Sequence, residues 1–249
     1  MITKEELNKI VQSAGLSLYQ QEKDYLLKLF LYYYYQKHRE ATFKGGTCLK
    51  YLLGIPRFSE DLDFNIKKVK TFQEQVRRTL QSFGSIGITY YFLKEEEFTD
   101  SYTCEIGFEG PLFTGDRQTQ NKFRIDAGYR TGTFRKPEWK IIKSEYPETT
   151  ENFLALVMDY QEILVEKIIA LVNRRKGRDL YDVWFMIQTG VALDKSLLQQ
   201  KAKKEKVKLD LTNICSRQEY ERDMSKLTNR MIPYEQVHKD ITKFLNYFR

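Results

Sequence analysis

Two acidic residues, Asp61 and Asp63, stand two positions apart in the segment 57–64, which reads RFSEDLDF. In a β-strand, residues i and i+2 point to the same face, so the two carboxylates lie side by side while Leu62 and Phe64 point to the other face. Adjacent carboxylates repel each other unless a cation lies between them, and a divalent metal ion is the economical explanation. The alternative is an exposed strand end whose acidic side chains face water.

A second strand, predicted at residues 123–128, carries Asp126 on its polar face. If this strand lies beside the first, Asp126 joins Asp61 and Asp63. Three carboxylates could hold one or two Mg²⁺ or Mn²⁺ ions and clamp an in-line phosphoryl displacement. Asp126 is also suited to take the proton from an attacking hydroxyl, because the chain has only two histidines and a carboxylate base is the better candidate.

Two glycines, Gly45 and Gly46, precede Thr47 and a short helix predicted over residues 48–53. Glycine lets the backbone approach a ligand closely. A helix that opens at Thr47 would aim free amide hydrogens and a hydroxyl at an anion such as a phosphate. A simple turn between a strand and a helix explains the same residues equally well.

Lys167 falls in the middle of an apolar stripe of the helix predicted over residues 159–174. A lysine there must either find an anion or extend its ammonium to water. If the anion is a nucleoside triphosphate, Lys167 would bind it as a point charge. On the next predicted helix, Asp182 lies opposite the apolar face, so periodicity predicts a surface residue paired with Arg178. The alternative is that Asp182 faces a cleft between domains and completes the site.

The elements that must position these residues change in character near residue 150. Before it, helices are predicted at 16–39 and 70–83, and short strands at 42–43, 62–66, 86–93, 102–108, 122–129 and 139–142. Short links between the later strands predict a largely antiparallel sheet in that half. Beyond about Glu148 strand signals nearly vanish, and helices are predicted at 159–174, 178–188, 195–208 and 233–248. We therefore predict one domain at residues 1–150 and a helical domain at residues 151–249.

The composition is that of an ordinary globular protein, with 249 residues, 41% hydrophobic and 30% charged. Its 41 Lys and Arg exceed its 34 Asp and Glu, giving a net charge of +7. That excess can mean an anionic partner such as nucleic acid, or merely a soluble surface. The three cysteines and two histidines show no short metal-ligand spacing, which argues against a zinc site or a disulfide framework. Without a signal sequence or an 18-residue apolar stretch, we expect a cytoplasmic protein with no membrane partner.

Several segments, in this order along the chain, resemble the AbiEii/AbiGii toxin family of nucleotidyltransferases. That family includes the MenT toxins and belongs to the DNA polymerase beta superfamily. The resemblance covers roughly residues 40 to 190 and rests on residues 44–47, 57–64, 124–126, 166–171 and 178–182. It implies an α+β protein, in which a minimal nucleotidyltransferase fold with a mixed or antiparallel sheet precedes a C-terminal helical bundle. The nucleotide is expected in the cleft between these two parts.

The resemblance implies roles for eight residues: Gly45, Gly46, Thr47, Asp61, Asp63, Asp126, Lys167 and Asp182. The two glycines and the threonine are expected to contact the triphosphate together with Lys167. The first two aspartates are expected to bind metal, and Lys167 and Asp182 to be required for activity. Asp126 matches the third carboxylate of the superfamily, whose use varies among its members.

Members of the family act as toxins in two-gene toxin–antitoxin or phage-defence systems, often with a DNA-binding antitoxin as partner. Some bind GTP, and some add pyrimidine nucleotides to the acceptor end of tRNA. The resemblance therefore implies a Mg²⁺-dependent transferase that moves a nucleoside monophosphate from an NTP to an acceptor, first of all the 3′ end of tRNA. Two alternatives stay open: a nucleotide- and RNA-binding protein without turnover, and a transferase that acts on a small molecule or a protein.

Overall fold

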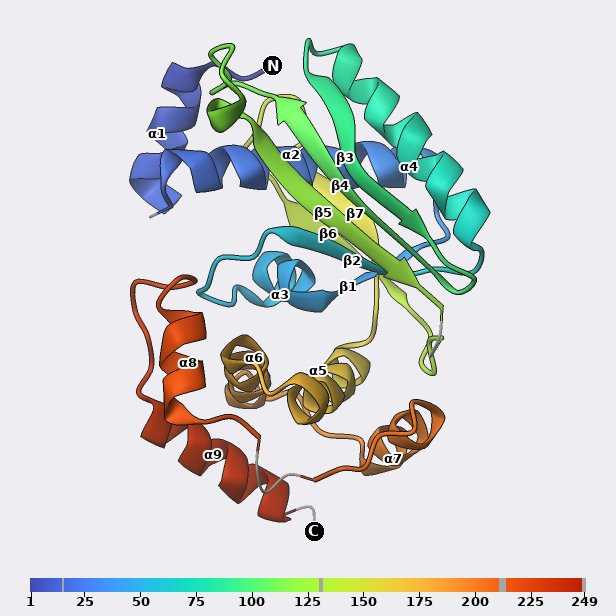
Figure 1. The fold of residues 1–249 in the computed structure, drawn as a ribbon, viewed down its shortest axis with the longest axis vertical. Coiled ribbons are helices and arrows are strands. Elements are labelled where there is room, and N and C mark those ends of the chain that lie inside the picture. Colours follow the sequence, from blue (N-terminus) through green and yellow to red (C-terminus); the bar gives the residue numbers. More distant parts are fainter. Residues whose placement is uncertain (15, 130–131, 211–213, 248–249) are drawn as a thin grey trace. The chain divides into compact units, whose positions relative to one another are not determined.

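The computed structural model describes residues 1–14, 16–129, 132–210 and 214–247 (Figure 1). By its internal contacts the chain divides into two units. We call the first the sheet unit; it comprises Met1–Leu52, Glu60–Gly132 and Pro137–Val157. The second, the helical unit, comprises Leu53–Ser59, Thr133–Lys136 and Met158–Arg249. Each unit is therefore built from segments that are far apart in the sequence.

A mixed sheet organises the sheet unit. Within the described residues it has seven strands in the order β3-β4-β5-β2-β1-β7-β6. The strands are β1 (Thr42–Lys44), β2 (Asp61–Asn65), β3 (Thr89–Glu97), β4 (Ser101–Glu109), β5 (Asn121–Gly128), β6 (Glu138–Lys143) and β7 (Asn152–Val157) (Figure 1). Strand β2 pairs in parallel with β5, as β1 does with β7, and the other neighbours are antiparallel. The predicted α+β class with a mixed sheet is confirmed.

One face of this sheet is apolar and covered by helices. α2 (Leu18–Lys37) packs against β5 and β7, and α4 (Val69–Gly84) packs against β3 and β4. The ring of Phe64 on β2 meets Phe30 of α2 and Phe72 of α4. α1 (Lys4–Ala14) packs against α2. Because strand side chains alternate, the burial of Phe64 fixes the polar residues of β2 on the opposite face.

The helical unit is a set of short helices around α6. Its described helices are α5 (Tyr160–Arg174), α6 (Gly177–Gln188), α7 (Lys195–Lys204), α8 (Arg217–Met224) and α9 (Tyr234–Tyr247). α6 packs against α5, α8 and α9, so it is surrounded on several sides. Asp159 caps α5 by accepting hydrogen bonds from the backbone N–H groups of Gln161 and Glu162 at 3.0 and 3.2 Å.

Several predicted boundaries were wrong. β7 lies beyond Glu148, where we predicted that strand signals nearly vanish, and α8 was not predicted. β3 starts at Thr89 rather than at residue 86, because the chain first turns after α4 through Gly87 at φ +76°. α7 ends at Lys204 rather than at 208. The predicted last helix reaches residue 248, which lies outside the described residues.

In the part of the chain that is described, we find no helix with the length and apolar character that crossing a membrane requires.

Candidate functional site

Asp63 and Asp126 are direct neighbours across two strands of the sheet unit. The parallel pairing of β2 with β5 places Asp63 opposite Asp126, and Asp61 opposite Arg124. Leu62 is fully buried on the helix-covered face, so the carboxylates project from the other face. There Asp63 and Asp126 line a hollow of about 340 Å³. The strand pairing on which the predicted acidic cluster depends is therefore present.

Asp126 is held through one of its two oxygens. Its Oδ1 accepts hydrogen bonds from the Thr103 hydroxyl at 2.6 Å and from the Arg124 Nη2 and Nε at 2.8 and 3.1 Å. Thr103 is the residue of the adjacent strand β4 that pairs with Asp126. Among the described residues these contacts all reach Oδ1, so Oδ2 keeps its lone pairs for a ligand or a proton.

The start of α3 (Gly45–Leu53) lies directly against Asp63. Gly45 has a φ of +80°, and a Cβ atom at this position would overlap the Asp63 carboxylate. Only glycine meets both demands, because it tolerates a positive φ and has no side chain. We predicted that this helix opens at Thr47, which was wrong by two residues, because Gly45 itself makes the turn out of β1. Asp63 therefore lies beside the backbone at the helix N-terminus.

Thr47 ties α3 to β2 on the same side. Its side chain is fully buried, and its hydroxyl donates to the backbone carbonyl of Asp61 at 2.6 Å. The hydroxyl proton is thus used within the protein. Phosphate recognition by this segment would rely on the backbone N–H groups of Gly45, Gly46 and Thr47, which are the groups that a helix N-terminus offers to an anion.

The metal site stays a prediction for Asp61, Asp63 and Asp126. Among the residues that the structure describes, no three His, Cys, Asp or Glu side chains gather closely enough to hold a metal ion. The donors nevertheless fit Mg²⁺, which prefers carboxylate oxygens and is bound through one or two carboxylates plus substrate phosphates. Because Gly45 has no side chain, the Asp63 carboxylate can lie directly beside the start of α3.

Asp182, in the helical unit, is fully buried, so the predicted surface position was wrong. Its carboxylate is paired with Arg57, whose Nε and Nη2 donate to Oδ1 and Oδ2 at 2.6 and 2.7 Å. The Lys167 ammonium lies 2.7 Å from Oδ2. Burial alone would raise the pKa of Asp182, but the charges of Arg57 and Lys167 outweigh it and lower the pKa to about 2. Asp182 is therefore ionised at neutral pH.

Lys167 obtains from Asp182 the anion that its place in an apolar stripe requires. A second carboxylate, that of Asp179, lies 3.8 Å from the Lys167 ammonium and is itself bound by Arg174 at 2.7 and 2.8 Å. Positive and negative side chains thus alternate from Arg174 through Asp179, Lys167 and Asp182 to Arg57. An ammonium has three N–H donors, and among the described residues Lys167 meets two carboxylates, so it can take a further acceptor.

Arg57 is the residue of this cluster that we did not predict. It lies in the motif that contains Asp61, but its partner Asp182 is 125 residues away in the sequence. A third N–H of its guanidinium donates to the carbonyl of Phe58 at 2.9 Å, and the Phe58 N–H donates to the carbonyl of Leu227 at 2.7 Å. A fixed bidentate arginine orients a carboxylate in a way that a lysine cannot. The signal available in the sequence was an arginine four residues before Asp61.

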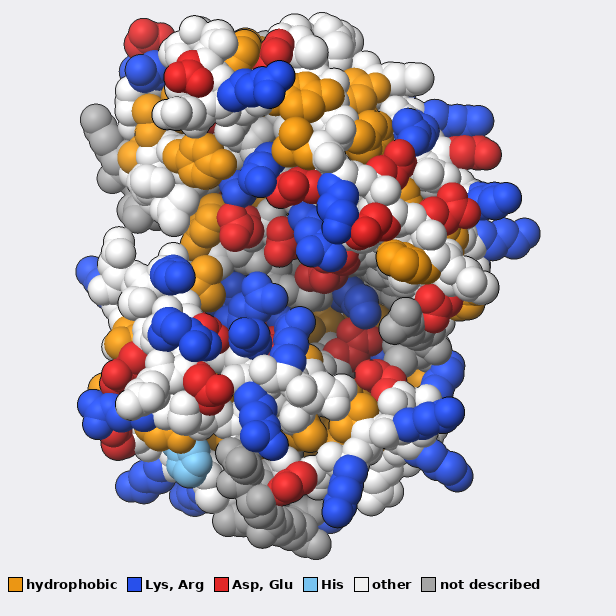
Figure 2. Space-filling model, in the orientation of Figure 1, with side chains coloured by type: hydrophobic (Ala, Val, Ile, Leu, Met, Phe, Trp, Pro, Cys, Tyr) orange, Lys and Arg blue, Asp and Glu red, His pale blue; other side chains and the backbone are white. Residues whose placement is uncertain are grey.

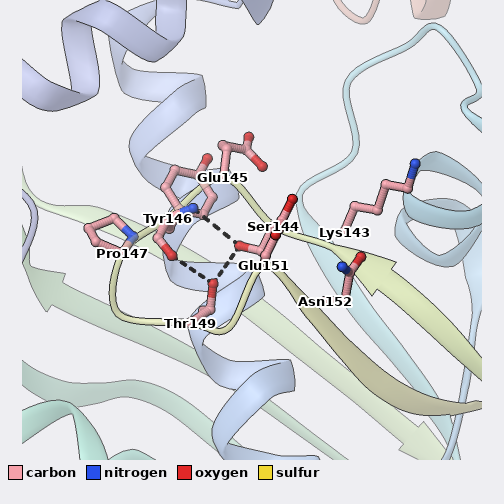
Figure 3. A pocket seen from close by; sticks show the side chains of 8 residues that line it. All are labelled: Lys143, Ser144, Glu145, Tyr146, Pro147, Thr149, Glu151 and Asn152. Atoms are coloured by element: carbon pink, nitrogen blue, oxygen red, sulfur yellow. Dashed lines mark hydrogen bonds between the residues drawn. The ribbon is translucent and has the colours of Figure 1, made fainter.

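The hollow at Asp63 and Asp126 is not the larger of the two hollows described here. A larger hollow, about 720 Å³, is formed by residues 143–152, the loop between β6 and β7 with its flanking residues (Figure 3). Its hydroxyl groups satisfy one another: Thr149 Oγ1 lies 2.6 Å from Ser144 Oγ and 2.9 Å from the Tyr146 carbonyl. None of the predicted site residues lines this hollow. We interpret these contacts as holding the loop together.

On the face shown in Figure 2, Lys and Arg side chains occur at many places, several of them side by side. Asp and Glu side chains lie among them. Charge alone does not mark a nucleic-acid surface, and any such surface has to be argued from particular residues.

Known proteins resemble this chain in sequence and in fold. A family model described as nucleotidyl transferase AbiEii toxin, type IV TA system, matches residues 30–248. MenT4, a nucleotidyltransferase toxin of Mycobacterium tuberculosis, has a similar structure, with a TM-score of 0.66, 16% identity, and 98% of this chain and 88% of that chain covered. JHP933 of Helicobacter pylori has a TM-score of 0.60 at 17% identity, with 90% and 89% covered. No curated protein sequence matches. At these identities the two structures show a shared fold.

Proposed function

This chain belongs to the AbiEii family of nucleotidyltransferase toxins, and on that basis we propose that it transfers a nucleoside monophosphate from an NTP to the 3′ end of tRNA. A toxin of a type IV toxin–antitoxin family also implies an antitoxin partner. The observation that carries the proposal is the parallel register of β2 and β5, which sets Asp63 opposite Asp126 beside the N-terminus of α3.

Asp126 is the proposed general base. The 3′ hydroxyl of the acceptor attacks the α-phosphorus, the new oxygen–phosphorus bond forms, and the bond to the pyrophosphate oxygen breaks. The hydroxyl proton passes to Asp126, whose Oδ1 is engaged by Thr103 and Arg124. A base within hydrogen-bond reach contributes about 10²- to 10⁴-fold to such a step.

Asp61 and Asp63 are the proposed metal ligands, with Asp126 as a third. Mg²⁺ or Mn²⁺ held there would neutralise the negative charge of the phosphates and of the departing pyrophosphate. The Asp63 carboxylate occupies the space that a side chain at position 45 would fill, and the Thr47 hydroxyl donates to the Asp61 backbone carbonyl.

The phosphates themselves are proposed to be bound by backbone N–H groups and by a lysine. The backbone N–H groups of Gly45, Gly46 and Thr47 would receive the triphosphate at the helix N-terminus. Lys167 would supply a compact positive charge, and Asp182 would orient its ammonium through the 2.7 Å contact. Such fixed charges stabilise the negative charge that develops during phosphoryl transfer.

Transfer of label from each radioactive NTP to total tRNA tests this proposal, with Mg²⁺ or Mn²⁺ present. We expect label on tRNA with the wild type, and nearly none with Asp63→Ala. The matched control is Glu138→Ala, an exposed acid on β6 that lies away from the hollow. Absence of label from tRNA with every NTP and both metals would overturn the proposal, and so would equal labelling by Asp63→Ala.

The position of attachment needs its own measurement. Periodate cleaves the cis-diol of the terminal ribose and thereby removes the 3′ hydroxyl. We expect periodate-treated tRNA to accept no label, whereas tRNA with a blocked 5′ end should accept it fully. Parallel reactions with total protein and with small metabolites test the two other acceptor classes. Label in either of these, with none in tRNA, would contradict the tRNA proposal.

A further inference from the structure

Phe98 is an exposed aromatic residue at the hollow that holds Asp63 and Asp126. It lies on the turn between β3 and β4, lines the hollow, and is 53% exposed. An exposed phenylalanine is unremarkable when it stands alone on a surface. This one adjoins the two carboxylates to which we assign the chemistry, which calls for an explanation.

The turn that carries Phe98 is fixed from both sides. The Phe98 N–H donates to the carbonyl of Ser101 at 2.8 Å. Just beyond β5, Tyr129 donates twice to the turn, from its N–H to the carbonyl of Asp100 at 3.1 Å and from its hydroxyl to the carbonyl of Thr99 at 2.9 Å. The Phe98 ring is therefore presented on a rigid support, which lowers the entropy lost when a ligand binds it.

The other residues of the hollow point to a nucleic-acid strand as its ligand. Lys44 and Arg124 place two cationic side chains at the same hollow as the Phe98 ring, and Arg124 is also paired with Asp126. Aromatic rings combined with cationic side chains are the features by which proteins bind unpaired bases and their backbone. A volume of about 340 Å³ is at the small end of ligand pockets, so it suits a single nucleotide unit better than a duplex.

We propose that Phe98 stacks on an unpaired nucleobase at the 3′ end of the acceptor RNA. This inference rests on the proposed function and names the residue that positions its acceptor. The base belongs to the acceptor rather than to the NTP, because Asp126 lines the hollow whereas Gly45, Gly46 and Thr47 do not. The hydroxyl that Asp126 deprotonates must come to this hollow, and the base of the same nucleotide then lies nearest Phe98.

Fluorescence of a short single-stranded RNA tests the stacking without turnover. An oligonucleotide with 2-aminopurine as its 3′-terminal base is titrated with protein in the absence of NTP. We expect quenching with the wild type and with Phe98→Trp, which keeps an aromatic face. Phe98→Leu keeps apolar area but loses the ring, and should bind about 5- to 150-fold more weakly, the range found when a stacking ring is removed.

The matched control is Trp139→Leu, which removes an exposed aromatic ring from β6 in the same sheet. We expect this variant to bind as the wild type does. A second oligonucleotide with 2-aminopurine at its 5′ end should show little quenching. Unchanged unfolding midpoints show that all variants are folded. Equal binding by Phe98→Leu and the wild type would overturn the inference, as would quenching that is equal at the two ends.

Steady-state transfer kinetics separate the acceptor from the nucleotide. Phe98→Leu should raise the KM for tRNA by a similar factor and leave the KM for the NTP unchanged. A rise confined to the KM for the NTP would mean that the ring stacks on the NTP base, which contradicts the inference. Quenching at the 3′ end without any transfer to RNA would support stacking while it overturns the proposed function. Transfer that Phe98→Leu leaves intact would overturn stacking alone.

Discussion

The carboxylates of Asp63 and Asp126 in the sheet unit differ in burial and in bonding from the carboxylate of Asp182 in the helical unit. Asp63 and Asp126 are half-buried and line a hollow, and Asp126 Oδ2 keeps its lone pairs. Asp182 is 0% exposed, and both of its oxygens are bound by Arg57 while Lys167 also meets Oδ2. The first pair lines a hollow, whereas both carboxylate oxygens of Asp182 are already bound within the protein. A direct role as a metal ligand thus suits Asp63 and Asp126, and a positioning role suits Asp182.

The same contrast decides what each group contributes to stability. A buried ion pair gains little over an apolar pair, but removal of one partner leaves the other charge unpaired away from water. Exposed or half-exposed charges lose much less, because water replaces the missing partner. Substitutions in the buried cluster around Asp182 should therefore affect folding first, whereas those at the hollow should affect activity alone.

Asp182→Ala is expected to be the most destabilising change. It leaves Arg57 and Lys167 buried without their shared carboxylate, which typically costs about 3–5 kcal/mol. Urea unfolding followed by circular dichroism measures the change in the free energy of unfolding. The control is Glu221→Ala, which removes an exposed partner of Arg217 and should change stability by less than about 0.5 kcal/mol. Equal effects of the two variants would contradict the contrast between buried and exposed carboxylates.

Lowering the pH should gradually remove the stabilisation that the ionised Asp182 carboxylate gives to the folded protein. The folded-state pKa of Asp182 is about 2, below the ordinary value of 3.8, so its stabilisation is fully present above pH 4. It is lost as the pH falls from about 4 to about 2, because the carboxylate then becomes protonated in the folded protein as well. Unfolding free energies measured across this range should fall more steeply for the wild type than for Asp182→Asn. Parallel curves for the two proteins would contradict the assigned pKa.

Arg57→Lys keeps the positive charge but loses the pair of guanidinium N–H groups that binds both oxygens of Asp182. A hydrogen bond to a charged group is worth about 1.5–3 kcal/mol, so we expect a loss of stability in that range. If Asp182 positions Lys167, transfer activity should also fall, and added guanidinium at low concentration should restore part of it in Arg57→Ala. A purely structural role predicts lost stability without such rescue.

The sequence was sufficient to predict the acidic strands β2 and β5, but not β7. In β2 and β5, apolar residues such as Leu62 and Ile125 alternate with Asp and Arg, so the period of two is visible. In β7 the outward residues Leu154 and Leu156 are as apolar as the buried ones, so no alternation can be read. Short apolar runs of this kind do not distinguish a strand from a buried helix.

Asp182 shows a second limit of reading the sequence alone. Its place opposite Leu180 and Val183 predicts exposure only if one face of the helix is covered. α6 packs against three helices, so its polar side is buried too, and Arg57 comes from a segment 125 residues earlier to neutralise it. Periodicity describes one helix, whereas the partners of a buried charge are set by the tertiary fold. Residue types and order indicated the site, but not which charges pair.

Asp126→Asn is expected to change stability least and activity most. The amide keeps the size of the side chain and an oxygen for Thr103 and Arg124, and at a half-buried position the change in unfolding free energy should stay within about 0.5 kcal/mol. Loss of the base should lower the rate of transfer by about 10²- to 10⁴-fold. The unfolding free energy and the transfer rate of this one variant distinguish a catalytic from a structural role. A large loss of stability with normal transfer would mean that Asp126 stabilises the fold rather than acting as the base. Transfer by Asp126→Asn that recovers as the pH rises, when hydroxide replaces the base, would confirm that the missing function is proton removal.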